Sequence, residues 1–171
     1  MYEHVIEEPK TWKAFFAAIY HTELPEILGF WKQYNIGQYI IALEVTQHSH
    51  KETAGEHFHF CAEMSDVTYH AFCKRVFKDR YKLSGQARNG KPKQYGKVTE
   101  IKDIKRMKAY CIKDDNYYTN LPTEEIDELR KISFAKVDKK PAKGSWTLEV
   151  VNYLNKEYPR HWDINNSVDK E

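Results

Sequence analysis

The stretch Gly55-Glu-His-Phe-His-Phe60 decides the fold of this chain and is the starting point for its chemistry. In a β-strand, successive side chains alternate between faces, so His57 and His59 should share one face and Phe58 and Phe60 the other. Such a strand presents two imidazoles on one side and two phenyl rings to a core on the other. Taken alone, a His-x-His pair is more simply interpreted as part of a half-buried strand with two polar surface histidines.

A second strand is predicted over residues 38–46, which are nearly all apolar except for Glu44. A carboxylate within such a run is costly to bury unless it is paired, hydrogen-bonded or bound to a metal, although a glutamate near a strand end often faces solvent. The polar loop 48–55 would turn the chain back, and a β-hairpin of this kind brings Glu44 beside His57 and His59. Two imidazoles and a carboxylate could bind a divalent ion and leave positions for water or a phosphate oxygen.

The other potential metal ligands form no recognisable pattern. Cys61, Cys73 and Cys111 are odd in number, match no zinc motif and lie in apolar contexts, so we expect reduced core residues of an intracellular protein. His48 and His50 lie in the hairpin loop and are expected to face solvent, although either could compete as a ligand.

Tyr110, Lys113 and Asp114 stand at i, i+3 and i+4 in a helix predicted over residues 102–115, so they would share one helical face. A tyrosine acts as a nucleophile when a cation and a metal stabilise the charge that develops on its oxygen. An isolated Tyr-x-x-Lys is more simply interpreted as part of an amphipathic helix with a half-buried tyrosine and solvated charges.

The segment from Lys74 to Lys113 is strongly basic, with 14 lysines and arginines and 3 acids in a chain whose net charge is only +2. A phosphate backbone suits these charges and unpaired bases can stack on the interleaved aromatic rings, although a solvated lysine-rich face is a common alternative. The residues predicted to contact DNA are Lys74, Arg75, Lys78, Arg80, Tyr81, Arg88, Lys91, Lys93, Tyr95 and Lys97.

Residues 85–91 match the glycine and lysine spacing of a phosphate-binding P-loop, but Pro92 follows where a serine or threonine is required. The missing hydroxyl removes a magnesium ligand and the proline removes a backbone donor. We therefore expect a basic loop or hairpin turn here and no ATP site.

Strands and helices alternate along the rest of the chain. Helices are predicted over residues 11–19, 23–34, 65–79 and 102–115, and short strands over residues 81–86 and 95–101. The first helix rests on the spacing of Trp12, Phe15, Phe16 and Ile19, and Ser65 or Asp66 is the expected N-cap of the third.

The composition changes at Leu121-Pro122, which predicts a boundary between a main domain, residues 1–122, and a helical appendage or linker, residues 123–171. Within the appendage, an amphipathic helix is predicted from Trp146 to Tyr158. No apolar run is long enough to predict a membrane span.

Glu44, His57-Phe-His59 and Tyr110-Cys-Ile-Lys113, taken in this order, resemble the motifs of the HUH endonucleases. The chain looks most like the rolling-circle replication initiators, or Rep proteins, of small circular single-stranded DNA viruses of the circovirus and geminivirus type. The resemblance covers roughly residues 38–116 and rests on the order and spacing of separate motifs.

The resemblance implies an α+β fold with a central antiparallel β-sheet flanked by helices, similar to an RNA-recognition module. It also implies that Glu44, His57 and His59 bind one Mn²⁺ or Mg²⁺ ion, with Asp114 adjusting the metal or the neighbouring lysine.

The implied reaction is transesterification of single-stranded DNA at an origin stem-loop. Tyr110 would attack the scissile phosphate and stay linked to the 5′ phosphate, leaving a free 3′ hydroxyl, and Lys113 would assist the tyrosine or steady the phosphate. Such a protein would act inside a cell, in the host nucleus for a eukaryotic virus, and the full-length protein could form homo-oligomers.

The chain departs from the family in three respects. Viral initiators usually open with a strand carrying a Phe-Thr-x-Asn-like or Phe-Leu-Thr-Tyr-like motif, which is missing before Gln38, so the resemblance does not extend to that N-terminal strand or to an origin-recognition role for it. The loop between Glu44 and His57 is long, and the helicase domain that usually follows is absent. Three alternatives stay open: an HUH transposase or plasmid initiator, a non-catalytic single-strand nucleic-acid binder, and a metal-dependent hydrolase that uses water as nucleophile.

Overall fold

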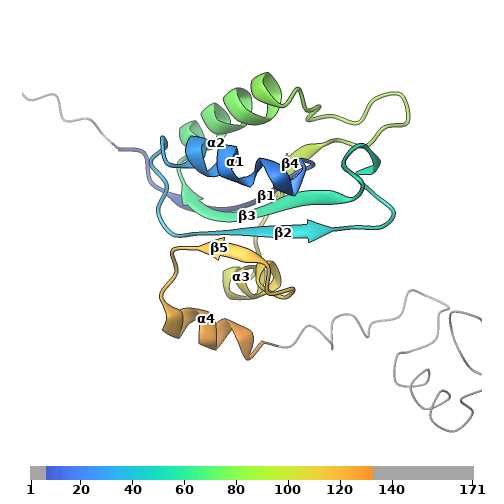
Figure 1. Cartoon of the computed structure of the whole chain (residues 1–171). Helices are drawn as coiled ribbons and strands as arrows, with labels where there is room; N and C mark the ends of the chain where they lie inside the picture. Colours follow the sequence, from blue (N-terminus) through green and yellow to red (C-terminus); the bar gives the residue numbers. More distant parts are fainter. Residues whose placement is uncertain (1–6, 133–171) are drawn as a thin grey trace, which may run out of the picture. The chain divides into compact units, whose positions relative to one another are not determined.

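Three long strands form the centre of the fold, as Figure 1 shows: β1 (Thr11–Ala17), β2 (Tyr39–Val45) and β3 (Glu56–Met64). The three-residue strands β4 (Tyr95–Lys97) and β5 (Tyr117–Thr119) lie at the edges, in the order β4-β1-β3-β2-β5, and every pair is antiparallel. The structure is a computed structural model, and it describes residues 7–132.

Helices cover both faces of this sheet (Figure 1). On one face lie α1 (Leu24–Trp31) and α2 (Asp66–Phe72), and α2 continues as a π-helical segment, η3 (Cys73–Arg80). On the other lie α3 (Ile104–Cys111) and α4 (Thr123–Arg130), and two short 3₁₀ turns, η1 (His21–Glu23) and η2 (Lys51–Thr53), complete the elements. The expected fold class, α+β with a central antiparallel sheet flanked by helices, is confirmed.

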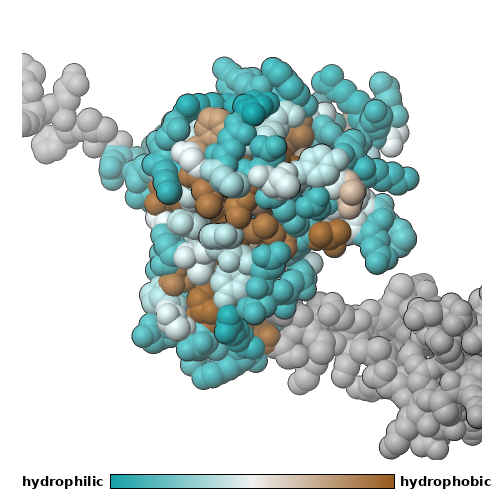
Figure 2. Space-filling view, in the orientation of Figure 1, coloured by the Kyte–Doolittle hydropathy of each residue, from teal (hydrophilic) through white to brown (hydrophobic). Residues whose placement is uncertain are grey.

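The main core lies between the sheet and the α1–α2 layer. Phe58 and Phe60 point into it from β3, and Phe60 stacks on Phe15 of β1, with ring centroids 4.8 Å apart, and on Trp31 of α1, at 5.4 Å. Full burial of each such ring contributes about 1.5–3 kcal/mol. In Figure 2, the hydrophobic residues visible on this side gather in a band where α1 meets the sheet, while the outer surfaces are hydrophilic.

The opposite face of the sheet carries a second, smaller apolar layer. Ile40 and Cys61 are buried beneath Ala109 and Cys111 of α3, and α4 adds the buried Leu129. All three cysteines are buried and unpaired, as predicted. No helix among residues 7–132 is long and apolar enough to cross a membrane.

The prediction of a helix over residues 11–19 is wrong, because residues 11–17 form strand β1. Phe15 enters the main core, while Phe16 points to the opposite face. A central strand that is covered on both faces loses the simple apolar–polar alternation and can mimic a helical pattern. The N-terminal strand that seemed to be missing is therefore present.

Several element boundaries also differ from the expectations. The strand predicted over residues 81–86 is absent, the strand predicted over residues 95–101 shortens to β4, and β5 was not predicted. Ser65 is the N-cap of α2, because its hydroxyl accepts a hydrogen bond from the Thr68 amide, as the sequence predicted. The loop that mimics a P-loop contains a turn closed by a bridge between Arg88 and Lys91, as expected.

The first compact unit of the chain extends to Ile132 and includes α4. Lys108 of α3 forms an ion pair of 2.8 Å with Glu125 of α4, and Leu129 is buried. The sheet domain therefore continues past Leu121-Pro122, while the dispensability of residues 123–171 for activity stays a prediction. The helix predicted from Trp146 to Tyr158 lies outside the described residues.

Candidate metal centre and basic groove

The predicted hairpin brings the three proposed metal ligands together. Glu44 of β2 is the direct cross-strand partner of His57 on β3, and Glu44 Oε2 lies 3.3 Å from His57 Nε2 and 3.7 Å from His59 Nε2. One ligand atom from each residue lies within 4.8 Å of the others, which makes the group able to hold a metal ion. His57 and Glu44 are buried, whereas the His59 side chain is 30% exposed, so the group is accessible from the His59 side.

The hairpin backbone fixes the orientation of the His57 ring. His57 Nδ1 lies 3.0 Å from the Gly55 carbonyl oxygen, which also accepts the Thr46 amide at 2.9 Å. The Gly55 carbonyl thus holds Nδ1, and the ring presents Nε2 to Glu44 Oε2 at 3.3 Å. Gly55 has φ +86°, and a Cβ atom there would lie 2.2 Å from the Thr46 carbonyl oxygen, so this turn requires glycine.

The electrostatics of the group lower the pKa values of both Glu44 and His59. Burial alone would raise the pKa of Glu44, but the hydrogen bond to His57, the charge of His59 and the hydrogen bond from Lys113 together lower it to about 2. Burial lowers the pKa of His59, the Glu44 carboxylate opposes that change, and His57 adds to it. An ionised carboxylate and neutral imidazoles are the forms that bind metals.

Lys113 joins this group to Tyr110. Its Nζ donates a 2.6 Å hydrogen bond to Glu44 Oε1 and lies 4.0 Å from the centroid of the Tyr110 ring. The ring of Tyr110 is 39% exposed, and its centroid lies 6.3 Å from that of His59. Partial burial opposes the charge on Lys113, but the hydrogen bond to Glu44 raises its pKa above the usual value.

The expectation of one continuous helical face was wrong, because α3 ends at Cys111 and Lys113 and Asp114 lie in the turn that follows. Asp114 is not among the three clustered ligands. Its Oδ2 lies 3.5 Å from Lys113 Nζ and its side chain is 62% exposed. Of its two expected roles, adjusting the metal or adjusting the neighbouring lysine, the position of Asp114 suits the second.

The two neighbouring tyrosines are placed differently from Tyr110. The Tyr117 hydroxyl accepts a 2.9 Å hydrogen bond from Arg130 of α4. Tyr118 pairs across the strands with Ile41, which points into the main core, so its side chain lies on the face of the sheet opposite to His59. Of these three tyrosines, Tyr110 is the one whose ring contacts Lys113.

His50 contacts the group although the sequence indicated a solvent-facing residue. Its ring centroid lies 4.6 Å from that of His57, and burial followed by the charge of His57 lowers its pKa. His50 has φ 54°, in the left-handed region, and this turn directs its side chain back toward the strands. His48 is exposed, as predicted.

A basic groove of about 820 Å³ lies along the β4 edge of the sheet, against α2 and η3. It is lined by six of the ten residues predicted to contact DNA, and no acidic residue lines it. The six are Lys74, Lys78, Arg88, Lys93, Tyr95 and Lys97.

The other four predicted DNA contacts lie outside this groove. Arg80 pairs with Glu26 at 2.6 Å, and the Tyr81 hydroxyl donates to the same carboxylate at 3.1 Å. Arg75 donates to Gln33 at 2.7 Å, and Lys91 lies in the neighbouring turn. Groups already engaged by protein partners are weaker candidates for phosphate contacts than the lysines of the groove.

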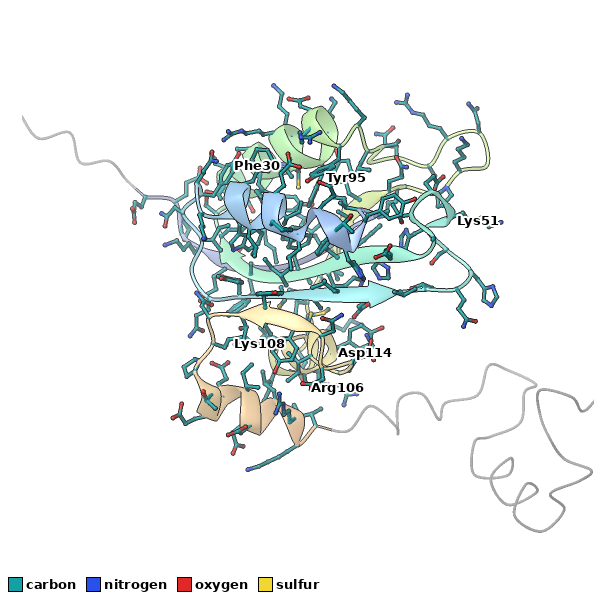
Figure 3. The ribbon with its side chains drawn as sticks, in the orientation of Figure 1. Phe30, Lys51, Tyr95, Arg106, Lys108 and Asp114 are labelled. Atoms are coloured by element: carbon teal, nitrogen blue, oxygen red, sulfur yellow. The ribbon has the colours of Figure 1, made fainter. Side chains whose placement is uncertain are left out.

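The groove and the metal group belong to different layers of the domain. In Figure 3, Tyr95 of the groove lies above the sheet, while Asp114, beside Lys113, lies below it. A polynucleotide that reached both sites would have to pass around the end or the β4 edge of the sheet.

Comparison of the chain with family models, with curated proteins and with solved structures found no match in any of the three.

Proposed function

We propose that this protein is a metal-dependent single-stranded DNA endonuclease and strand transferase that nicks DNA by tyrosine attack, as a rolling-circle initiator does. The observation that carries the proposal is the position of Lys113, 2.6 Å from Glu44 Oε1 and 4.0 Å from the centroid of the Tyr110 ring. Lys113 therefore contacts both the ion-binding group and the ring of the proposed nucleophile.

The proposed ion is Mn²⁺ or Mg²⁺, bound by Glu44 Oε2 and the Nε2 atoms of His57 and His59. This mixed set of oxygen and imidazole ligands suits such an ion when water and a phosphate oxygen complete its coordination. When bound, the ion would polarise the scissile phosphate and neutralise part of its charge.

Tyr110 is the proposed nucleophile. Its hydroxyl oxygen attacks phosphorus and loses its proton to solvent, the bond from phosphorus to the 3′ oxygen breaks, and that oxygen takes up a proton. The products are a 5′-phosphotyrosine link and a free 3′ hydroxyl. Because one phosphoester replaces another, no water or redox partner is consumed.

Lys113 is the proposed electrostatic partner of this step. Against the effect of partial burial, the hydrogen bond to Glu44 raises the pKa of Lys113 above its usual value, so the lysine is charged at neutral pH. It therefore stabilises negative charge on the tyrosine oxygen and the phosphate and does not accept a proton. Glu44 holds the ammonium group through Oε1, which leaves Oε2 for the ion. The groove at the β4 edge supplies affinity for the rest of the strand.

The test is to incubate the protein with single-stranded DNA and Mn²⁺, denature it, and look for a covalent adduct. The wild type should form the adduct, Tyr110→Phe should not, and Tyr117→Phe should retain it because Arg130 engages that hydroxyl elsewhere. Peptide mapping should place the nucleotide on Tyr110. Cleavage without an adduct would support the alternative of a hydrolase that uses water, and binding without cleavage would support a non-catalytic binder.

A further inference from the structure

A row of rings extends from the metal group toward the β4 edge on the same face of the sheet. The His50 ring lies between His57 and Phe16, with centroid distances of 4.6 Å to His57 and 5.5 Å to Phe16. Phe16 pairs directly with His59 in the β1–β3 ladder, so the two side chains share a face. Phe16 is only partly buried.

The ammonium group of Lys93 lies at the end of this row that is farther from the metal group. Lys93 Nζ lies 6.0 Å from the centroid of the Phe16 ring, and Lys93 also lines the basic groove. Phe16 pairs on its other side with Gly96 of β4, where a Cβ atom would lie 2.9 Å from Lys93 Nζ. The missing side chain at Gly96 thus gives the lysine room to lie across the strand.

The backbone next to Lys93 is held by hydrogen bonds to Ala18, which follows β1, and to Ser84. The Gln94 carbonyl accepts the Ala18 amide at 2.8 Å, and the Gln94 amide donates to the Ser84 carbonyl at 2.7 Å. The turn that carries His50 is also braced, because the His50 carbonyl accepts the amides of Thr53 and Gly55. The backbone near both His50 and Lys93, the two polar neighbours of the Phe16 ring, is therefore held by hydrogen bonds.

From these contacts we propose that Phe16, His50 and Lys93 form a nucleotide subsite next to the metal group, where an unpaired base stacks on Phe16 and Lys93 holds the adjoining phosphate. The inference rests on the proposed function and deepens it, since it names the route by which a single strand leaves the groove, crosses the sheet edge at Gly96 and reaches the scissile position. A partly exposed phenyl ring beside a cation suits a base with its phosphate, and stacking does not require a particular base.

The test measures binding without metal, in chelator, so that its readout does not depend on cleavage. Fluorescence anisotropy would compare a mixed-sequence single strand with an abasic strand of the same length, which keeps the phosphates and removes the bases. Phe16→Leu should weaken binding of the normal strand about tenfold and leave binding of the abasic strand unchanged, whereas Phe16→Tyr should match the wild type on both.

Two further variants test the cation. Lys93→Gln should weaken binding of both strands to a similar extent, because it removes a positive charge that faces a phosphate. Gly96→Ala should reproduce part of that effect by displacing the lysine. Thermal melting checks that each variant is folded.

Equal weakening on normal and abasic strands for Phe16→Leu would overturn the subsite, because the defect would then be structural. Equal affinity of Phe16→Leu and Phe16→Tyr for the normal strand would overturn it as well. Either result can occur while the wild type still forms its tyrosyl adduct, which would leave the proposed function standing. If Phe16→Leu weakens binding of the normal strand only, and the wild type forms no adduct, the subsite would be supported and the proposed nicking reaction would be rejected.

Discussion

His57 and His59 are expected to be needed for ion binding and dispensable for DNA binding. The double variant His57→Ala/His59→Ala removes two of the three ligands and should abolish Mn²⁺ binding in calorimetry and cleavage together. DNA affinity measured in chelator should stay close to that of the wild type. His48→Ala is the matched control, because this histidine is exposed and should leave ion binding unchanged. Cleavage by the double variant in chelator would contradict the assignment.

Lys113 is expected to act on the rate of adduct formation and not on ion affinity. Lys113→Met keeps most of the side-chain length and removes the charge, so the rate should fall roughly 10²–10³-fold, the typical effect of removing one transition-state donor. Lys108→Met is the control on the preceding helical turn, since Lys108 pairs with Glu125 and lies 4.2 Å from the centroid of the Trp12 ring. A similar fall in rate in both variants would indicate a folding effect.

The residues of the metal group could be predicted from the sequence because their placement depends on local rules. Strand alternation puts His57 and His59 on one face, and the hairpin then places Glu44 opposite them. His50 escaped prediction because its direction depends on a left-handed turn within an irregular loop. The cross-sheet contact between Phe16 and Lys93 depends on an edge strand that is only three residues long.

At the scale of single elements, the β2–β3 hairpin should be sensitive to its glycine. Gly55→Ala places a residue with a side chain at φ +86° and against the Thr46 carbonyl, so the free energy of unfolding should fall by about 1–3 kcal/mol. Ion affinity should fall as well, because the Gly55 carbonyl orients His57. Both quantities can be measured, by urea unfolding and by calorimetry.

Gly29→Ala provides the matched control. Gly29 lies inside α1, and a Cβ atom there would meet nothing within 4 Å. Alanine should therefore raise the free energy of unfolding by about 0.5–1 kcal/mol through helix propensity. A decrease in stability at Gly29 as large as that at Gly55 would show that the turn geometry is not the cause.

The elements differ in how well the sequence predicts them, for a physical reason. α1 and the helix formed by α2 and η3 each bury one face and keep the other in solvent, so their periodicity is visible. β1 is covered on both sides, with Phe15 in one layer and Ala14 buried in the other, which removes the alternation that would have identified it. β5 is three residues long and is defined by its pairing with β2, an arrangement that no local pattern encodes.

For the whole molecule, the basic groove should set the salt dependence of DNA binding. Replacing Lys74 and Lys78 by glutamine should reduce the slope of log affinity against log salt by about 0.7 for each phosphate that is no longer neutralised. Lys131→Gln is the control, because this lysine lies next to α4, on the other side of the sheet, and pairs with Glu128 at 2.7 Å. A slope unchanged by the double variant would place the DNA elsewhere on the surface.

The pairing of Glu44 with His57 has a further consequence for folding. The ligands lie on two strands that meet only when the hairpin forms, so an ion binds the native state more tightly than the unfolded chain, which keeps only the local histidines. Mn²⁺ at 100 times its dissociation constant should then raise the free energy of unfolding by up to about 2.7 kcal/mol, visible as a higher melting temperature that chelator reverses. The variant that lacks both histidines should melt at the same temperature with and without Mn²⁺. Because a slip of one residue between β2 and β3 would turn Glu44 to the opposite face, the ion would act as a clamp that stabilises only the native strand alignment.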